Sequence, residues 1–215
     1  MGAFDPNIVR AAYDTVAADY VATFGDDLDQ LPLDRSVLDD AVGRRVGDGP
    51  MIDLGCGPGQ VARYLADRGA HSIGLDLSPE MLHQARRQAE GQPFVCGDLR
   101  SLPFRSAGAS GAVAFYSIQH LPRRDLPVAL DEIRRVLAPG GILVIATHLG
   151  QGEVYVPELL GHPLQPVGGT MYGDHELQGM LEGHHFRVER VRHREPLPHE
   201  YSSNRIYLTA RSLEE

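Results

Sequence analysis

A glycine-rich turn between an apolar segment and a helical pattern constrains the fold of this chain more than any other feature. Residues 51–54 form a short apolar run, and three glycines then alternate between Gly55 and Gly59. From Gln60 onward, apolar residues recur with helical spacing. Glycine adopts backbone torsions closed to other residues and allows a ligand to lie against the main chain. A strand, a glycine turn and a helix N-terminus in this order predict an open α/β sheet that binds a ligand at the carboxyl end of a central strand.

The spacing of the glycines distinguishes two classes of ligand. The dinucleotide fingerprint is G-x-G-x-x-G, whereas this chain has G-x-G-x-G, with Asp53 two residues before the first glycine. The sequence D-L-G-C-G-P-G resembles the first motif of class I S-adenosylmethionine-dependent methyltransferases. That resemblance implies that Gly55, Cys56, Gly57 and Gly59 hold the amino-acid end of S-adenosylmethionine and that Asp53 serves its ammonium group. An ordinary strand-to-helix turn without a ligand is the alternative.

A second acidic residue, Asp76, ends the next predicted strand. Residues 72–76 form this strand, and Asp76 lies one βαβ step beyond the glycine turn. A carboxylate at this strand end can accept hydrogen bonds from both hydroxyls of a ribose. The family resemblance further implies that Leu77 and Met81 flank the adenine of the cofactor. For Met81, a purely structural role in the core is the alternative.

A third acidic residue follows the third predicted strand, residues 93–96. By the same resemblance, the Asp98 carboxylate accepts a hydrogen bond from the adenine amino group, and the backbone N–H of Leu99 serves a ring nitrogen. Taken alone, Asp98 is more typical of a turn or a helix cap. Three acids at three successive strand ends nevertheless favour one shared site.

Residues 111–117 predict a fourth strand that is apolar enough to be covered on both faces of the sheet. In the family this segment passes beneath the transferred methyl group, which implies a cofactor contact for Phe115 and acceptor contacts for Tyr116 and Ser117. His120 follows and is a candidate general base, because imidazole titrates near neutrality. The alternative is that His120 shapes the pocket or hydrogen-bonds the backbone.

Residues 142–147 predict a fifth strand after an L-A-P-G-G sequence, which ends the preceding helix and is shared by the family. His148 comes directly after this strand and is the second candidate base. Glycines and prolines then break the pattern, so residues 149–172 are expected to form an irregular acceptor-side loop. Tyr155 and Tyr172 are candidate acceptor contacts in that loop.

Two helices are predicted before the glycine turn, over residues 7–22 and about 33–45. Tyr13 and Tyr20 are seven residues apart and therefore share one helix face. The pattern Y-D-x-x-A-x-x-Y resembles the first helix of the family, in which the second tyrosine, here Tyr20, covers the methionine end of the cofactor. Tyr13 is assigned to the acceptor side. Simple packing is the alternative for both rings.

The last part of the chain predicts a helix over residues 174–182, capped by Asp174, and two strands, residues 186–191 and 205–210. With the family resemblance, this pattern implies one Rossmann-like α/β domain with a seven-stranded, mostly parallel sheet of order 3-2-1-4-5-7-6. The last strand is antiparallel, and helices cover both faces. The expected parts are a helical lid (1–46), a cofactor-binding core (47–148), an acceptor-side loop (149–172) and a closing helix with an antiparallel strand pair (173–215).

The composition excludes several other classes of protein. A formal net charge of −9 and a pI near 5.5 argue against a nucleic-acid partner. No metal-binding motif, export signal or membrane-spanning run is present in the sequence. Cys56 and Cys96 are expected as buried free thiols in a reducing cytoplasm. Surface positions are expected for the histidines of the C-terminal region, which give no defined ligand set: His184, His185, His193 and His199.

The resemblance implies methyl transfer from S-adenosylmethionine to an oxygen or nitrogen of a small molecule, with S-adenosylhomocysteine as product. Because the methyl group is already activated, the enzyme would act mainly by proximity and alignment. We expect a monomer or homodimer. The alternatives are an S-adenosylmethionine-binding enzyme that does not methylate, such as a cyclase or decarboxylase, and a regulatory subunit. A macromolecular acceptor is less favoured, because no N-P-P-Y-like motif follows Phe115.

Overall fold

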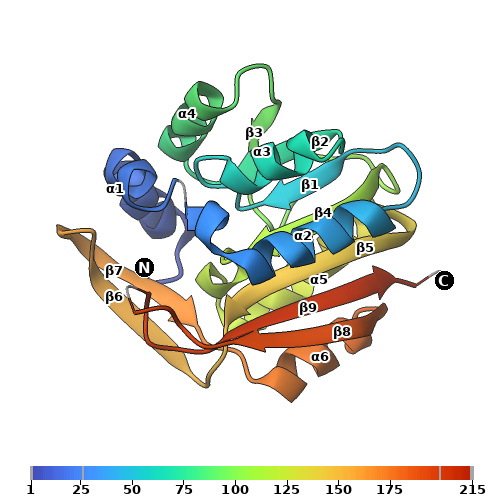
Figure 1. Cartoon of the computed structure of the whole chain (residues 1–215). Coiled ribbons are helices and arrows are strands. Elements are labelled where there is room, and N and C mark those ends of the chain that lie inside the picture. Colours follow the sequence, from blue (N-terminus) through green and yellow to red (C-terminus); the bar gives the residue numbers. More distant parts are fainter. Residues whose placement is uncertain (1, 26, 199, 214–215) are drawn as a thin grey trace.

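Seven strands form the central sheet of the domain, in the order β3-β2-β1-β4-β5-β9-β8 (Figure 1). This is the predicted order, because β8 and β9 are the sixth and seventh strands of this sheet. Strands β1 to β5 run parallel, and β9 is antiparallel to both of its neighbours, as predicted. The computed structural model describes residues 2–25, 27–198 and 200–213. The strands of the sheet are β1 (Met51–Leu54), β2 (Ser72–Asp76), β3 (Phe94–Cys96), β4 (Ala109–Phe115), β5 (Leu137–His148), β8 (Phe186–Arg194) and β9 (Arg205–Ser212).

Helices cover both faces of the sheet. Successive strand residues point to opposite faces, so Ile52 joins the core cluster that includes α5 and α6, while Met51 joins the cluster that includes α2 and α3. Every residue of β4 is buried, which agrees with a strand covered on both sides. The helices are α1 (Pro6–Phe24), α2 (Pro32–Arg44), α3 (Gln60–Asp67), α4 (Pro79–Gln88), α5 (Leu126–Val136) and α6 (Asp174–Gly183), with 3-10 turns η1 (Asp27–Gln30), η2 (Ile118–His120) and η3 (Arg123–Asp125).

Local hydrogen bonds explain where the helices begin. The Ser78 hydroxyl accepts from the backbone N–H of Met81 at 3.1 Å and caps α4. The prediction that Asp174 caps α6 is wrong by one residue. The N-cap is Gly173, whose backbone is extended. Its N–H donates to the Glu176 carboxylate at 3.1 Å, so a side chain three residues later replaces the missing cap side chain.

The segment expected to be an irregular loop forms a β-hairpin instead. Strands β6 (Glu153–Leu159) and β7 (His162–Thr170) pair antiparallel and make a separate two-stranded sheet. Leu160 and Gly161 both have positive φ values, 51° and 80°, as a tight two-residue hairpin turn requires. Pro157 lies at a register shift, where the ladder needs no N–H donor. Prolines and glycines therefore concealed a strand pair that alternates half-buried and exposed residues along β6.

The remaining expectations concern cysteines, histidines and membrane segments. Both cysteines are free; Cys56 is buried as predicted, but Cys96 is exposed, so that prediction is wrong for Cys96. His184 and His193 each pair with one surface carboxylate, and His199 lies outside the described residues. Among the residues that the structure describes, no group of three or more His, Cys, Asp or Glu could hold a metal ion. No helix in the same ranges is long and apolar enough to cross a membrane.

Candidate active site

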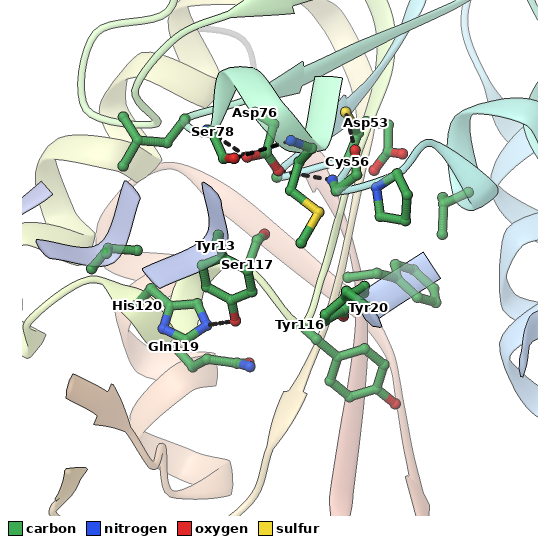
Figure 2. A pocket seen from close by; sticks show the side chains of 18 of the residues that line it. Tyr13, Tyr20, Asp53, Cys56, Asp76, Ser78, Tyr116, Ser117, Gln119 and His120 are labelled. Atoms are coloured by element: carbon green, nitrogen blue, oxygen red, sulfur yellow. Dashed lines mark hydrogen bonds between the residues drawn. The ribbon is translucent and has the colours of Figure 1, made fainter. Parts of the chain in front are cut away.

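A cavity of about 410 Å³ lies at the carboxyl ends of the central strands, beneath α1 (Figure 2). In Figure 2, Asp53, Cys56 and Asp76 lie on one side of it, and Tyr13, Gln119 and His120 lie on another. The structure thereby brings together most of the predicted site residues. Those that line the cavity are Tyr13, Tyr20, Asp53, Gly55, Cys56, Gly57, Asp76, Leu77, Met81, Asp98, Leu99, Phe115, Tyr116, Ser117, His120 and His148.

The three glycines of the turn have different structural reasons for being glycine. All have positive φ values, between 51° and 87°. A Cβ atom on Gly55 would come within 2.3 Å of the Ser117 Cβ, and one on Gly59 within 3.0 Å of the Phe94 ring. A Cβ on Gly57 would meet no atom within 4 Å, because this residue borders the open cavity. Gly59 lies outside the cavity lining, so the structure gives it a packing role between α3, α4 and β3.

Asp76 connects the end of β2 to the glycine turn. Its Oδ2 accepts from the backbone N–H of Gly57 at 2.8 Å, and its Oδ1 accepts from the backbone N–H of Ser78 at 2.8 Å. Burial raises the pKa of this carboxyl, and the hydrogen bonds from backbone N–H groups oppose that rise. The carboxyl lies at the cavity wall between the turn and α4, where a ligand hydroxyl can reach it.

Asp53 is a buried carboxyl with an unfilled hydrogen-bonding position. Only 1% of the residue is exposed, and its Oδ2 has no hydrogen-bond partner among the described residues. Burial raises the pKa of Asp53 to about 8, with a backbone hydrogen bond from Ala62 acting in the opposite direction. A cationic group of a ligand would supply the partner that this carboxyl lacks.

Asp98 is held by a neighbouring arginine. The Arg100 side chain pairs with the Asp98 carboxylate at 2.6 Å, and its backbone N–H donates to the same carboxylate at 2.9 Å. These hydrogen bonds hold the pKa of Asp98 below its usual value despite partial burial. Arg100 also lines the cavity and was not predicted. Met81 lines the cavity too, but with 1% exposure it is equally a core residue packed with α1, so both interpretations apply.

The side chain of His120 has a defined tautomer. Its Nδ1 lies 3.2 Å from the carbonyl oxygen of Gly168, which can only accept, so Nδ1 carries the proton. Its Nε2 lies 2.7 Å from the Tyr13 hydroxyl and therefore accepts a hydrogen bond from it (Figure 2). Burial lowers the pKa of His120 and raises that of Tyr13. The lone pair that a general base needs is thus already engaged by Tyr13.

His148 lines the opposite part of the cavity. Its Nδ1 lies 2.7 Å from the Ser203 hydroxyl. Burial, followed by the positive charge of Arg205, lowers the pKa of His148 to about 4. A neutral imidazole with so low a pKa is a weak proton acceptor near neutral pH.

Several polar residues that line the cavity were missed by sequence reasoning. They are Gln119, Glu200, Tyr201 and Arg205, and together with the predicted His148 we call them the β9 end of the cavity. Glu200 and Tyr201 come from the polar segment between β8 and β9, and Arg205 begins β9 directly opposite His148. The only sequence signal was that this segment follows a predicted edge strand.

Beside the β9 end, a hydrogen-bonded group of tyrosines and one acid crosses from α2 to the sheet. The Tyr207 hydroxyl donates to the buried Asp34 carboxylate at 2.7 Å and lies 3.0 Å from the Tyr116 hydroxyl. Tyr116 has a positive φ of 53°, an uncommon conformation for a residue with a bulky side chain. This backbone places the ring in the cavity wall directly after β4. Ser117, by contrast, donates its hydroxyl to the Leu54 carbonyl at 2.7 Å.

Two predicted acceptor contacts lie elsewhere. Tyr155 is 58% exposed on the β6–β7 hairpin and donates its hydroxyl to Glu153 at 2.8 Å. Tyr172 is fully buried in the main core cluster. The prediction that these residues line the pocket is therefore wrong, because the segment pairs as a hairpin rather than folding over the cavity as a loop.

Comparison with known proteins agrees with this geometry. Residues 52–145 match a family model described as a methyltransferase domain. Residues 52–145 are a methyltransferase domain of the class I S-adenosylmethionine-dependent type. The match spans the segment from β1 to β5, which includes the glycine turn, Asp76 and Asp98. The family implies S-adenosylmethionine as the methyl donor.

Two curated methyltransferases illustrate the range of relatives. A malonyl-[acyl-carrier protein] O-methyltransferase of Pseudescherichia vulneris is 39% identical over 109 residues, which are 51% of this chain and 41% of the relative. A demethylmenaquinone methyltransferase of Beutenbergia cavernae is 32% identical over 145 residues, 66% of this chain and 58% of the relative. The chain thus spans about half the length of the curated relatives it matches. A crystal structure of an S-adenosylmethionine-dependent methyltransferase from Methanosarcina mazei shares the fold, with a TM-score of 0.71 and 19% identity over 80% of this chain and 96% of that chain.

The residues of this methyltransferase domain fit the cofactor that the family uses. Gly57 leaves space at the cavity wall, Asp76 offers carboxylate oxygens beside it, and Asp53 has an oxygen without a partner in the described part of the chain. A zwitterionic nucleoside with a ribose and an ammonium group is complementary to these three features.

Proposed function

We propose that the chain transfers a methyl group from S-adenosylmethionine to an oxygen or nitrogen of a small molecule. The observation that carries this proposal is that one cavity joins the glycine turn and Asp76 to the β9 end. A cofactor and an acceptor can therefore bind next to each other in one partly enclosed space. Binding both in a fixed orientation lowers the entropic cost of bringing them together. The two curated relatives, both named as methyltransferases, support this reaction class.

The cofactor would be held mainly by backbone and carboxylate groups. The glycine turn and Asp53 would receive its amino-acid end, Asp76 its ribose hydroxyls, and Asp98 with the Leu99 backbone its adenine. When bound, S-adenosylmethionine supplies a methyl group activated by the sulfonium charge. The chain's own contribution is then to align a nucleophile with that group and to keep water out.

Alignment is favoured over general-base catalysis by the states of the two histidines. His120 has its Nε2 engaged by Tyr13, and His148 has a pKa near 4. Neither is a free base of matched pKa near neutral pH. The aromatic rings of Tyr13 and Tyr20 lie 6.1 Å apart on the face of α1 that lines the cavity, where they would shield the reacting groups from water.

The N-terminal helices are proposed to act as a lid over the cofactor. In support of this, the Asp14 carboxylate of α1 accepts from the Ser78 hydroxyl at 2.5 Å, directly beside Asp76. The hairpin also packs against α1, since Val167 of β7 lies in one core cluster with Ile8 and Val9 of that helix. The Gly168 N–H also donates to the Ala3 carbonyl, just before α1, at 2.8 Å. Besides this lid, the proposed parts of the domain are a cofactor-binding core and a closing unit made of α6 with strands β8 and β9.

The proposal is tested by incubating the protein with S-adenosylmethionine and a panel of small oxygen and nitrogen nucleophiles. We expect S-adenosylhomocysteine and a methylated product in equal amounts with at least one acceptor. An Asp76→Ala variant is the control for contaminating activity. A product formed without S-adenosylhomocysteine would instead support a non-methylating enzyme on the same fold.

A further inference from the structure

The β9 end of the cavity is rich in hydrogen-bond donors that have no partner among the described residues. The Gln119 Oε1 accepts from the Thr147 hydroxyl at 3.2 Å, which orients the amide. Its NH₂ group then remains without a hydrogen-bond partner among the described residues, at the cavity wall. An amide fixed in this way offers donors, not an acceptor, to a ligand.

His148 also presents a donor. The Ser203 hydroxyl oxygen accepts from Arg205 Nη1 at 3.0 Å and can donate its own proton to His148 Nδ1, 2.7 Å away. With Nδ1 accepting, the neutral imidazole carries its proton on Nε2. In the described part of the chain Nε2 has no partner, and His148 lines the cavity.

Arg205 adds a buried positive charge. It is 3% exposed, lines the cavity, and its Nε has no hydrogen-bond partner in the described ranges of the chain. The nearest carboxylate, Glu200, is bound by both terminal nitrogens of Arg194 at 2.6 and 2.8 Å, whereas Arg205 lies 3.6 Å from it. The other nearby acid, Asp34, is also nearest to Arg194, at 3.8 Å. The charge of Arg205 is thus the less neutralised of the two arginines.

Aromatic rings enclose these donors. The Tyr116 ring centre lies 5.7 Å from that of His148. The Tyr201 ring centre lies 5.6 Å from that of His148, in an edge-to-face arrangement. Arg205 also lies 5.9 Å from the Tyr116 ring centre. Flat, apolar walls around a cluster of donors suit a small, planar ligand with one negatively charged group.

We propose that the methyl acceptor carries a carboxylate, held at the β9 end by Gln119, His148 and Arg205. Calling this ligand the acceptor rests on the proposed function; the carboxylate site itself rests on the donors described above. A guanidinium whose charge is incompletely neutralised and two neutral donors match the acceptor-only oxygens of a carboxylate. An uncharged amide of the same shape would place its own N–H groups against these donors.

The test is a titration of the S-adenosylhomocysteine-loaded protein with benzoate and, separately, with its neutral isostere benzamide. We expect benzoate to bind at least about tenfold more tightly, a difference of about 1.4 kcal/mol, because a charge-assisted hydrogen-bonded pair is stronger than a neutral one. Equal affinities, or no benzoate binding, would overturn the proposal. The same titration on cofactor-free protein keeps the result independent of whether S-adenosylhomocysteine binds.

Three variants assign the effect to the site. Gln119→Glu keeps an oxygen that can accept from Thr147 but adds a negative charge. It should weaken benzoate binding by at least about tenfold and leave benzamide binding unchanged. Arg205→Gln should do the same. Because Arg205 also donates to the Tyr201 and Ser203 carbonyls, Gln119→Glu is decisive if the Arg205→Gln variant fails to fold.

The control variant is Arg190→Gln, which lies on the exposed edge strand and outside the cavity lining. It should leave benzoate binding unchanged. Benzoate affinity unaltered by Gln119→Glu would also overturn the proposal.

Discussion

Binding of the cofactor should release a proton from Asp53. In the free protein this carboxyl has a pKa of about 8, so it is protonated at about pH 6.5. A bound ammonium group beside the unpartnered Oδ2 would favour the carboxylate and ionise it. Because the α-amino group of the free ligand is itself protonated well below pH 8, the net release should be about 0.9 of a proton per ligand at that pH.

The same ionisation makes affinity depend on pH with a defined sign. Ionising a carboxyl of pKa about 8 at about pH 6.5 costs about 2 kcal/mol, which is subtracted from the binding free energy. Affinity should therefore rise as the pH approaches 8. Above that pH the ligand's own amine loses its proton and affinity should fall again.

Calorimetric titration with S-adenosylhomocysteine in two buffers of different ionisation enthalpy measures the released proton directly. The dependence of the observed heat on the buffer enthalpy gives the number of protons released. Asp53→Asn keeps the size and shape of the side chain but cannot ionise, so its heat should be independent of the buffer. A wild-type release near zero would show that Asp53 is already ionised and would refute the reasoning.

The remaining predictions concern the rest of the site. Asp76→Ala should weaken S-adenosylhomocysteine binding by roughly 1–3 kcal/mol in calorimetry, because ribose hydroxyls lose their acceptor; unchanged affinity would remove Asp76 from the site. Gly55→Ala should destabilise the fold by about 3 kcal/mol or more in urea unfolding, since its φ is positive and its Cβ has no room, whereas Gly57→Ala should cost only about 1–2 kcal/mol. Equal losses would contradict the different surroundings of the two glycines. Once an acceptor is known, His120→Ala and His148→Ala should each change kcat by less than about tenfold; a larger drop in either would replace the alignment mechanism with base catalysis.

The sequence was sufficient to predict most strands of the central sheet, because their signals are local, whereas the strand order followed from the family resemblance. Buried strands, the glycine turn and helix caps such as Ser78 depend on residues within a few positions of one another. The three strand-end acids Asp53, Asp76 and Asp98 could be placed together because parallel strands end at one edge of a sheet. All three line the observed cavity.

Contacts between distant segments could not be predicted in the same way. The engagement of His120 by Tyr13 and Gly168 joins α1, η2 and the hairpin, and nothing near His120 in the sequence indicates it. Arg205 resembles an ordinary charged residue at a strand start until β9 pairs with β5 and places it opposite His148. The hairpin itself was hidden because prolines and glycines usually mark loops, whereas here Pro157 lies where the ladder is already interrupted.

The most direct test of the account is a calorimetric titration of the purified protein with S-adenosylmethionine, S-adenosylhomocysteine and, as a control, NAD. The account predicts that the first two bind with micromolar affinity and that NAD does not. The glycine spacing, and an Asp53 Oδ2 without a partner among the described residues, suit a cationic amino acid rather than a pyrophosphate. Binding of NAD, or of none of the three, would contradict the central claim that this cavity is a methyl-donor site.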